Sequence, residues 1–105
     1  MSIVAYVPDL MDRSRVLAAA EGVRFVAAPE DLLTQTSPED VVIVDLDRPR
    51  GIEIAGQLKV ERVIGFLRHD DRDGIAKAKA AGIQQVEVRS RFFPQIDKIL
   101  SQGRS

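Results

Sequence analysis

The feature that most constrains this 105-residue chain is a set of short apolar runs that recur along its whole length. Four of them are nearly continuous, which is typical of strands covered on both faces, as in a parallel sheet between two layers of helices. They are Ile3–Val7, Val23–Ala28, Val41–Asp45 and Arg62–Leu67. A fifth run, Gln84–Arg89, alternates more and predicts an edge strand.

Segments with helical spacing separate these runs. The clearest begins with aspartates at Asp70, continues through alanine-rich sequence to Ala81, and meets a terminator at Gly82. In the first helix, Val16, Leu17 and Ala20 are expected on one face, with Gly22 as the stop. The predicted helices are Asp9–Glu21, Pro29–Thr36, Ile52–Val60, Asp70–Ala81 and Pro94–Leu100.

Strand and helix therefore alternate five times, a pattern that predicts a doubly wound α/β fold with a five-stranded parallel sheet. The length, with 45% apolar and 30% charged residues, suits one hydrophobic core. We expect a single domain over residues 1–105. In such a sheet, ligands bind beyond the carboxyl ends of the strands.

The amino-acid composition bears on which partners the protein can bind and in which cellular compartment it is expected. Fifteen basic and sixteen acidic side chains leave a formal charge of −1, too small a field to favour nucleic acid as a partner. The chain has no cysteine, which excludes disulfides and thiolate metal sites. Pro8 and Asp9 interrupt the first apolar run, and no run approaches the roughly 20 residues of a membrane span. A cytoplasmic protein that does not bind membranes is expected.

Charged side chains follow the strands at the predicted ligand-binding edge. Asp9 comes after the first strand, Asp45 and Asp47 close the third, Arg68 follows the fourth and Arg89 ends the fifth. Converging carboxylates repel one another unless a cation or an arginine neutralises them. The pattern predicts either an Mg²⁺ site at Asp9, Asp45 and Asp47, or a salt bridge from Arg89 or Arg68 to Asp45 that closes the site without a metal ion.

The segment Val41–Pro49 resembles the third strand of response-regulator receiver domains, where a strand-ending aspartate is followed four positions later by a proline. Asp45 and Pro49 occupy those places. The segment Ala80–Ile83 is similar to the end of the family's fourth helix, and Arg89, seven residues after Gly82, lies where the family has a lysine. The resemblance implies a flavodoxin-like (βα)5 sheet with strand order 2-1-3-4-5, a place in bacterial two-component phosphorelay signalling, and Asp45 as phosphoacceptor.

Several positions depart from the family pattern, and three of them bear directly on phosphoryl binding. Pro8 replaces one of two adjacent metal-binding acids, and Leu67 replaces a hydroxyl residue that contacts the phosphoryl group. Arg89 presents a planar guanidinium in place of a compact ammonium. These departures favour an atypical receiver whose site does not operate as a phosphorylation switch.

The leading hypothesis is a stand-alone receiver-like signalling module that is not an enzyme. It binds a protein partner, or a second copy of itself, through the face made by Asp70–Ala81, Gln84–Arg89 and Pro94–Leu100. Its candidate binding residues are Asp9, Asp45, Asp47, Leu67, Arg68 and Arg89. Two alternatives stay open: a genuine Mg²⁺-dependent phosphoacceptor with Asp45 as acceptor, and a small metal-dependent hydrolase that uses the same acids.

Overall fold

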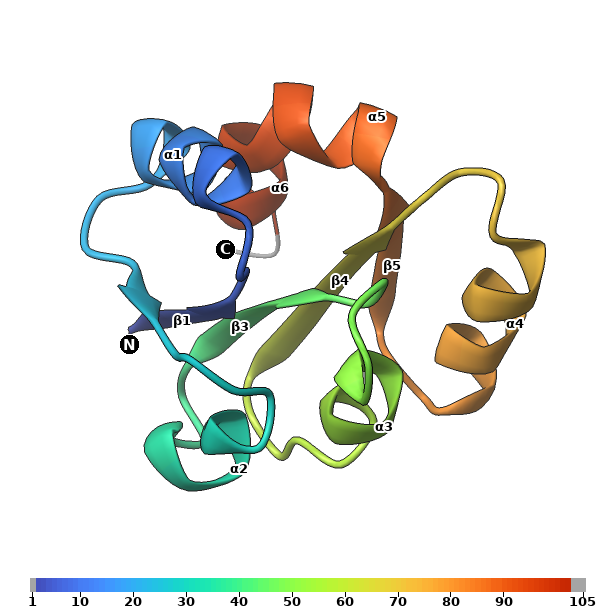
Figure 1. Ribbon diagram of the computed structural model, residues 1–105. Helices are drawn as coiled ribbons and strands as arrows, with labels where there is room; N and C mark the ends of the chain where they lie inside the picture. The colour runs from blue at the N-terminus through green and yellow to red at the C-terminus, as the bar shows by residue number, and fades with distance from the viewer. Residues whose placement is uncertain (1, 103–105) are drawn as a thin grey trace.

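The sheet has five parallel strands in the order β2-β1-β3-β4-β5 in a computed structural model that describes residues 2–102 (Figure 1). This confirms the predicted fold class and strand order. The strands are β1 Ile3–Tyr6, β2 Arg24–Phe25, β3 Val41–Asp45, β4 Arg62–Leu67 and β5 Gln85–Val88.

Helices cover both faces of the sheet. They are α1 Leu10–Ala19, α2 Asp31–Gln35, α3 Gly51–Ala55, α4 Arg72–Ala80, α5 Arg89–Phe92 and α6 Ile96–Ser101, with a 3₁₀ turn at Phe93–Gln95. Figure 1 shows α1, α5 and α6 together on one side, with α2, α3 and α4 on the other. None of the helices in the described part of the chain is long and apolar enough to cross a membrane.

Two apolar cores follow from the alternation of side chains along each strand. In β1, Val4 and Tyr6 pack with Leu32 and Ile54 on the α2–α4 side. Ala5 packs on the opposite side in a cluster with Val16, Phe66, Phe92 and Ile96. Every residue of β3 is buried, so the central strand is covered on both faces as its apolar run predicts.

The predicted helix stop at Gly82 is confirmed, because α4 ends at Ala80 with Ala81 as its C-cap. The first helix ends earlier than predicted, at Ala19 with an extended C-cap at Ala20, so Gly22 lies in the turn beyond it. Both glycines have left-handed backbone, with φ of +74° and +85°, where a side chain would be strained. The expectation that Leu17 joins Val16 on the buried face is wrong, because Leu17 is 50% exposed while Val16 is fully buried. Asp12 lies four residues before Val16 on that buried face.

Several boundaries differ from the predicted ones. β2 pairs with β1 at only two positions, so the run 23–28 forms a much shorter strand. The third helix ends at Ala55, before Gly56, and does not continue to Val60. The last helical segment begins earlier, at Arg89, and is interrupted around Pro94, whose nitrogen has no proton to donate to a helical hydrogen bond.

Candidate functional site

Asp45 ends the central strand β3, and its carboxylate is almost fully buried, with 3% of the side chain exposed. The Asp47 backbone N–H donates to Oδ1 at 3.1 Å. The Arg48 Nε lies 3.5 Å from Oδ2. Burial raises the pKa of Asp45, and the Asp47 N–H and the charges of Arg48 and Arg89 oppose that rise only in part. Both oxygens of the candidate acceptor therefore already have partners inside the protein.

The loop after Asp45 is held tightly against the sheet. Leu46 packs over Gly65 of β4, where a Cβ atom would overlap the Leu46 side chain, and the Leu46 N–H donates to the Phe66 carbonyl at 2.9 Å. Further along, a Cβ at Gly51 would lie 2.6 Å from the Asp45 carbonyl oxygen. At Gly51 the clash would be with backbone, so glycine is required there, whereas a side chain at Gly65 would require Leu46 to move.

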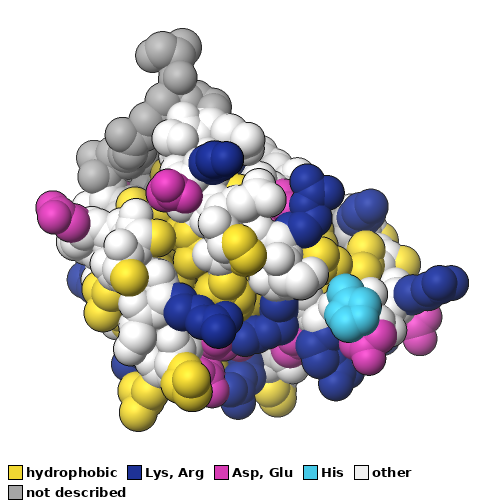
Figure 2. Space-filling view, turned by 90° about the horizontal axis from the view of Figure 1, so that it is seen from above, with side chains coloured by type: hydrophobic (Ala, Val, Ile, Leu, Met, Phe, Trp, Pro, Cys, Tyr) yellow, Lys and Arg dark blue, Asp and Glu magenta, His cyan; other side chains and the backbone are white. Residues whose placement is uncertain are grey.

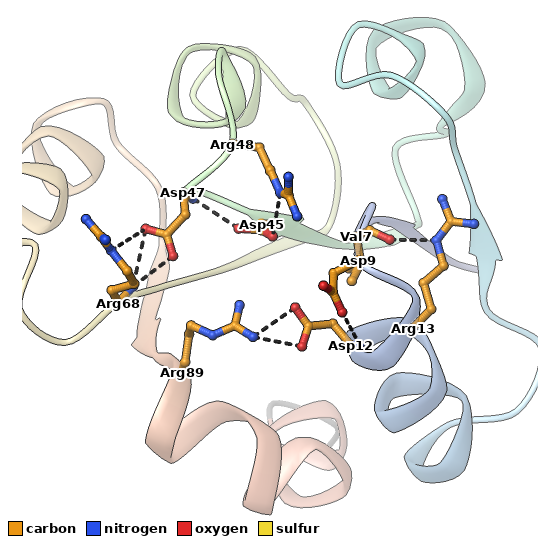
Figure 3. Close-up of polar contacts among 9 residues, drawn as sticks. All are labelled: Val7, Asp9, Asp12, Arg13, Asp45, Asp47, Arg48, Arg68 and Arg89. Atoms are coloured by element: carbon orange, nitrogen blue, oxygen red, sulfur yellow. Dashed lines mark hydrogen bonds and ion pairs between the residues drawn. The ribbon is translucent and has the colours of Figure 1, made fainter.

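Asp47 points away from Asp45, toward β4 (Figure 3). Its carboxylate accepts the Arg68 backbone N–H at 3.1 and 3.3 Å, and the Arg68 Nε lies 3.9 Å from Oδ1. Arg68 therefore contacts Asp47, and the predicted alternative of an Arg68–Asp45 salt bridge is wrong. The neighbouring Leu67 is fully buried in the core on the α2–α4 side of the sheet.

Asp9 is the N-cap of α1. Its Oδ1 accepts the Asp12 backbone N–H at 3.0 Å, which satisfies one of the free donors of the first helical turn. That hydrogen bond, with a second from the Met11 N–H and the positive charges of Arg48 and Arg89, lowers the pKa of Asp9. The Asp9 carboxylate therefore stabilises the N-terminus of α1 as its cap.

Arg89 reaches α1 instead of Asp45. A single guanidinium nitrogen, Nη2, donates to both carboxylate oxygens of Asp12, at 2.7 and 2.8 Å. The guanidinium carbon lies 5.3 Å from the Phe66 ring centre and 4.9 Å from that of Phe93. Burial alone would lower the pKa of Arg89, but the hydrogen bond and charge of Asp12 raise it overall. The predicted Arg89–Asp45 salt bridge is therefore wrong, because a nearer buried carboxylate takes the guanidinium.

Sequence reasoning missed both Asp12 and Arg48. Asp12 carried a usable signal, since a charged residue four positions from buried Val16 lies on the buried face of a helix and requires a partner there. Arg48 lies three residues after Asp45, but its sequence position does not tell which carboxylate it faces. Figure 3 shows these side chains with Asp9, Asp47, Arg68 and Arg89 around one edge of the sheet.

No protein-family model matches this chain, and no curated protein matches it either. Solved structures do match. A response regulator from Thermotoga maritima superimposes with a TM-score of 0.70 at 13% identity, covering 96% of this chain and 94% of that one. The chain has the receiver-domain fold. A response regulator receiver domain from Rhodospirillum rubrum gives a TM-score of 0.65 at 17% identity, covering 94% of this chain and 90% of its own.

The receiver fold places Asp45 at the carboxyl end of the central strand, but the side chains around it do not form an Mg²⁺ site as they lie. Mg²⁺ requires oxygen ligands in near-octahedral geometry. Here Asp9 accepts a helix N–H, Asp47 turns to β4, and a guanidinium lies beside Asp45. Over residues 2–102, no three His, Cys, Asp or Glu side chains form a group that could hold a metal ion. The assignment of an Mg²⁺ ion to Asp9, Asp45 and Asp47 stays a prediction.

Proposed function

We propose that this protein is an atypical receiver-like signalling module that binds another protein without depending on phosphorylation of Asp45. The receiver fold supports a signalling role, and the likeness to response regulators favours a place in cytoplasmic two-component pathways. The proposal assigns no catalytic turnover to the chain. Its output would pass through a bound partner.

The observation that carries the proposal is the arrangement of arginines around Asp45. Phosphoryl transfer to a carboxylate needs a cation on the acceptor side and a positive charge free to stabilise the incoming group. Arg48 already lies beside the Asp45 carboxylate, and Arg89 is hydrogen-bonded to Asp12. Both arginines near Asp45 are therefore already engaged by carboxylates of the protein itself.

A second observation argues against a conformational switch that couples Asp45 to the rest of the molecule. Leu67, at the position where the receiver family has a hydroxyl residue, is fully buried and has no polar atom to offer a phosphoryl oxygen. A conformational switch needs an interaction that differs between its two states. The Leu67 side chain provides no polar interaction that could differ between a phosphorylated and an unphosphorylated state.

The proposed partner surface is the face made by α4, β5 and the last helices, α5 and α6, the second of which covers most of the predicted helix Pro94–Leu100. Among residues 2–102, β5 is hydrogen-bonded in the sheet to β4 alone, so its outer edge offers backbone donors and acceptors. A groove of about 250 Å³ runs beside it, lined by Ile75, Lys79, Val86, Glu87, Val88 and Arg91. Apolar side chains between charges of both signs suit a protein partner.

Titration with Mg²⁺ and beryllium fluoride, followed by the amide resonances of the full chain, tests the proposal. We expect the amides of Asp47, Arg48 and Arg89 to stay unshifted, and the Asp45→Asn variant to behave like the wild type. A saturable shift in the wild type that the variant loses would overturn the proposal and establish Asp45 as an acceptor.

One observation favours that alternative of an Mg²⁺-dependent phosphoacceptor. The Arg48 side chain is 45% exposed, and its Nε lies 3.5 Å from the carboxylate, so the ion pair is a weak one that Arg48 can leave. An Arg48→Ala variant that binds Mg²⁺ where the wild type does not would show that the arginine alone blocks the site.

A further inference from the structure

A hollow of about 650 Å³ lies between α1 and the last helices, on the face opposite α2, α3 and α4. Ala18 and Ala19 of α1 line one side of it, and Phe93, Pro94 and Ile96 line the other. Figure 2 looks onto this face and shows hydrophobic side chains in its middle, bordered by charged ones. Sites that hold small organic molecules have volumes of roughly 300–1,000 Å³, so this hollow is large enough for one. We call it the α1–α5 hollow.

One end of the α1–α5 hollow carries two guanidinium groups. The guanidinium carbon of Arg15 lies 5.3 Å from the centre of the Phe93 ring, and that of Arg89 lies 4.9 Å from the same centre. Within residues 2–102, Arg15 makes no ion pair. Arg89 gives only its Nη2 to Asp12, so its Nε and Nη1 have no hydrogen-bond partner among the same residues. Both arginines therefore keep N–H donors for an anion, and the Phe93 ring holds them in place beforehand.

The other end of the α1–α5 hollow is acidic. Asp97 lines both this hollow and an adjoining one of about 270 Å³, in which Glu21 is a second acidic side chain. Arg15 and Arg89 line the larger hollow and not the smaller one. The two carboxylates would repel an anion at their end, whereas the guanidinium groups attract it to the other. The charges therefore favour one orientation, with the anionic group of a ligand at the arginines and its apolar body between the walls.

We propose that the α1–α5 hollow binds a small aromatic acid, that is, a carboxylate carried on a flat apolar body. The carboxylate would accept hydrogen bonds from Arg15 and Arg89, because a planar guanidinium matches the two oxygens of a carboxylate. The apolar body would lie between the alanines of α1 and Pro94, where its burial adds to the affinity. A bare inorganic anion would use the charges but leave these walls in contact with water.

This ligand site does not rest on the function proposed above, because it does not use Asp45. The site would stand even if Asp45 proved to be a phosphoacceptor. A bound ligand would contact α1 and also the last helices, which form part of the proposed partner surface. The α1–α5 hollow therefore gives the module an input that requires no phosphoryl group.

Titration of the full chain with benzoate, up to about 50 mM at constant ionic strength and followed by amide resonances, tests the site. We expect saturable shifts at Ala18, Ser90 and Phe93. Benzamide keeps the ring without the charge, and acetate keeps the charge without the ring. Each should bind about tenfold more weakly than benzoate, because each lacks one of the two contributions. The absence of a saturable shift with benzoate would overturn the proposal, as would an equal affinity for benzamide or acetate.

Two variants test the charge and the space of the α1–α5 hollow separately. Arg15→Gln removes the guanidinium that makes no ion pair, and Ala18→Phe places a ring in the hollow from an exposed helix position. Each should weaken benzoate binding about tenfold or more. Arg72→Gln, which removes an exposed arginine from α4, is the matched control and should leave the affinity unchanged.

Circular dichroism of each variant confirms folding. If Arg15→Gln unfolds, Arg15→Lys takes its place and should weaken benzoate binding severalfold, since an ammonium lacks the planar fork of a guanidinium. An affinity that either Arg15→Gln or Ala18→Phe leaves unchanged would overturn the proposal. So would an equal loss of affinity in Arg72→Gln.

Discussion

Arg89 donates two hydrogen bonds to the carboxylate of Asp12, at 2.7 and 2.8 Å, and so joins the end of β5 to the buried face of α1. Asp12 is 5% exposed, and its partner is packed against two aromatic rings. Arg89, which lies where the receiver family has a lysine, is therefore part of the framework that holds α1 against the sheet in this molecule.

Asp12→Ala is expected to destabilise the fold by about 1–3 kcal/mol, because it leaves the half-buried Arg89 guanidinium without its partner. Urea unfolding monitored by circular dichroism measures the change. Asp70→Ala is the control, since Asp70 makes only a long, exposed contact with Arg68 and should cost less than about 1 kcal/mol. Equal losses in the two variants would contradict a structural role for the Asp12–Arg89 pair.

Arg48→Ala is expected to raise the pKa of Asp45 further, because it removes a positive charge that favours the ionised carboxylate. Carboxyl-carbon NMR titration of the folded protein follows this group. Arg68→Ala provides the comparison, as Arg68 contacts Asp47 and should move the Asp45 pKa less. An unchanged or lowered Asp45 pKa in Arg48→Ala would show that the ion pair does not form in solution.

Asp45 also gives the stability of the protein a defined pH dependence. Its pKa is raised in the folded state, so the folded protein holds this proton more tightly than the unfolded chain. Stability from this group therefore falls as pH rises from the unfolded pKa through the folded one. Asp45→Asn, which keeps an oxygen for the Asp47 N–H, should be more stable than the wild type at neutral pH, and the gain should shrink in acid. A gain that grows as the pH falls would contradict this sign.

Asp9→Ala is expected to cost about 1 kcal/mol through loss of the α1 N-cap, whereas Asp9→Ser should retain most of the stability, since a serine hydroxyl also accepts the Asp12 N–H. Thermal unfolding of both variants distinguishes them. If Asp9→Ser were as unstable as Asp9→Ala, the carboxylate would have a role beyond capping.

The fold could be predicted from sequence because each strand carries its own signal. Buried runs such as Val41–Asp45 and glycine stops such as Gly82 are local, and alternation of strands and helices leaves few topologies. The partners of charged side chains could not be predicted in the same way. The charges of Asp12, Asp45 and Asp47 all act on Arg89, but it pairs with Asp12 while its guanidinium lies against the Phe66 and Phe93 rings, and sequence shows neither contact.

The contact between Leu46 and Gly65 bears on any attempt to rebuild a working phosphorylation site in this scaffold. The Leu46 side chain packs over Gly65 and its N–H donates to the Phe66 carbonyl, so the backbone between Asp45 and Asp47 is held against β4. Substituting an acid at Pro8 and a hydroxyl residue at Leu67 would supply the missing polar atoms. The Asp47 carboxylate would still accept the Arg68 N–H and point toward β4. Redesign of the site would therefore have to change the packing of Leu46 against Gly65 and the Arg68–Asp47 contact together with the polar residues.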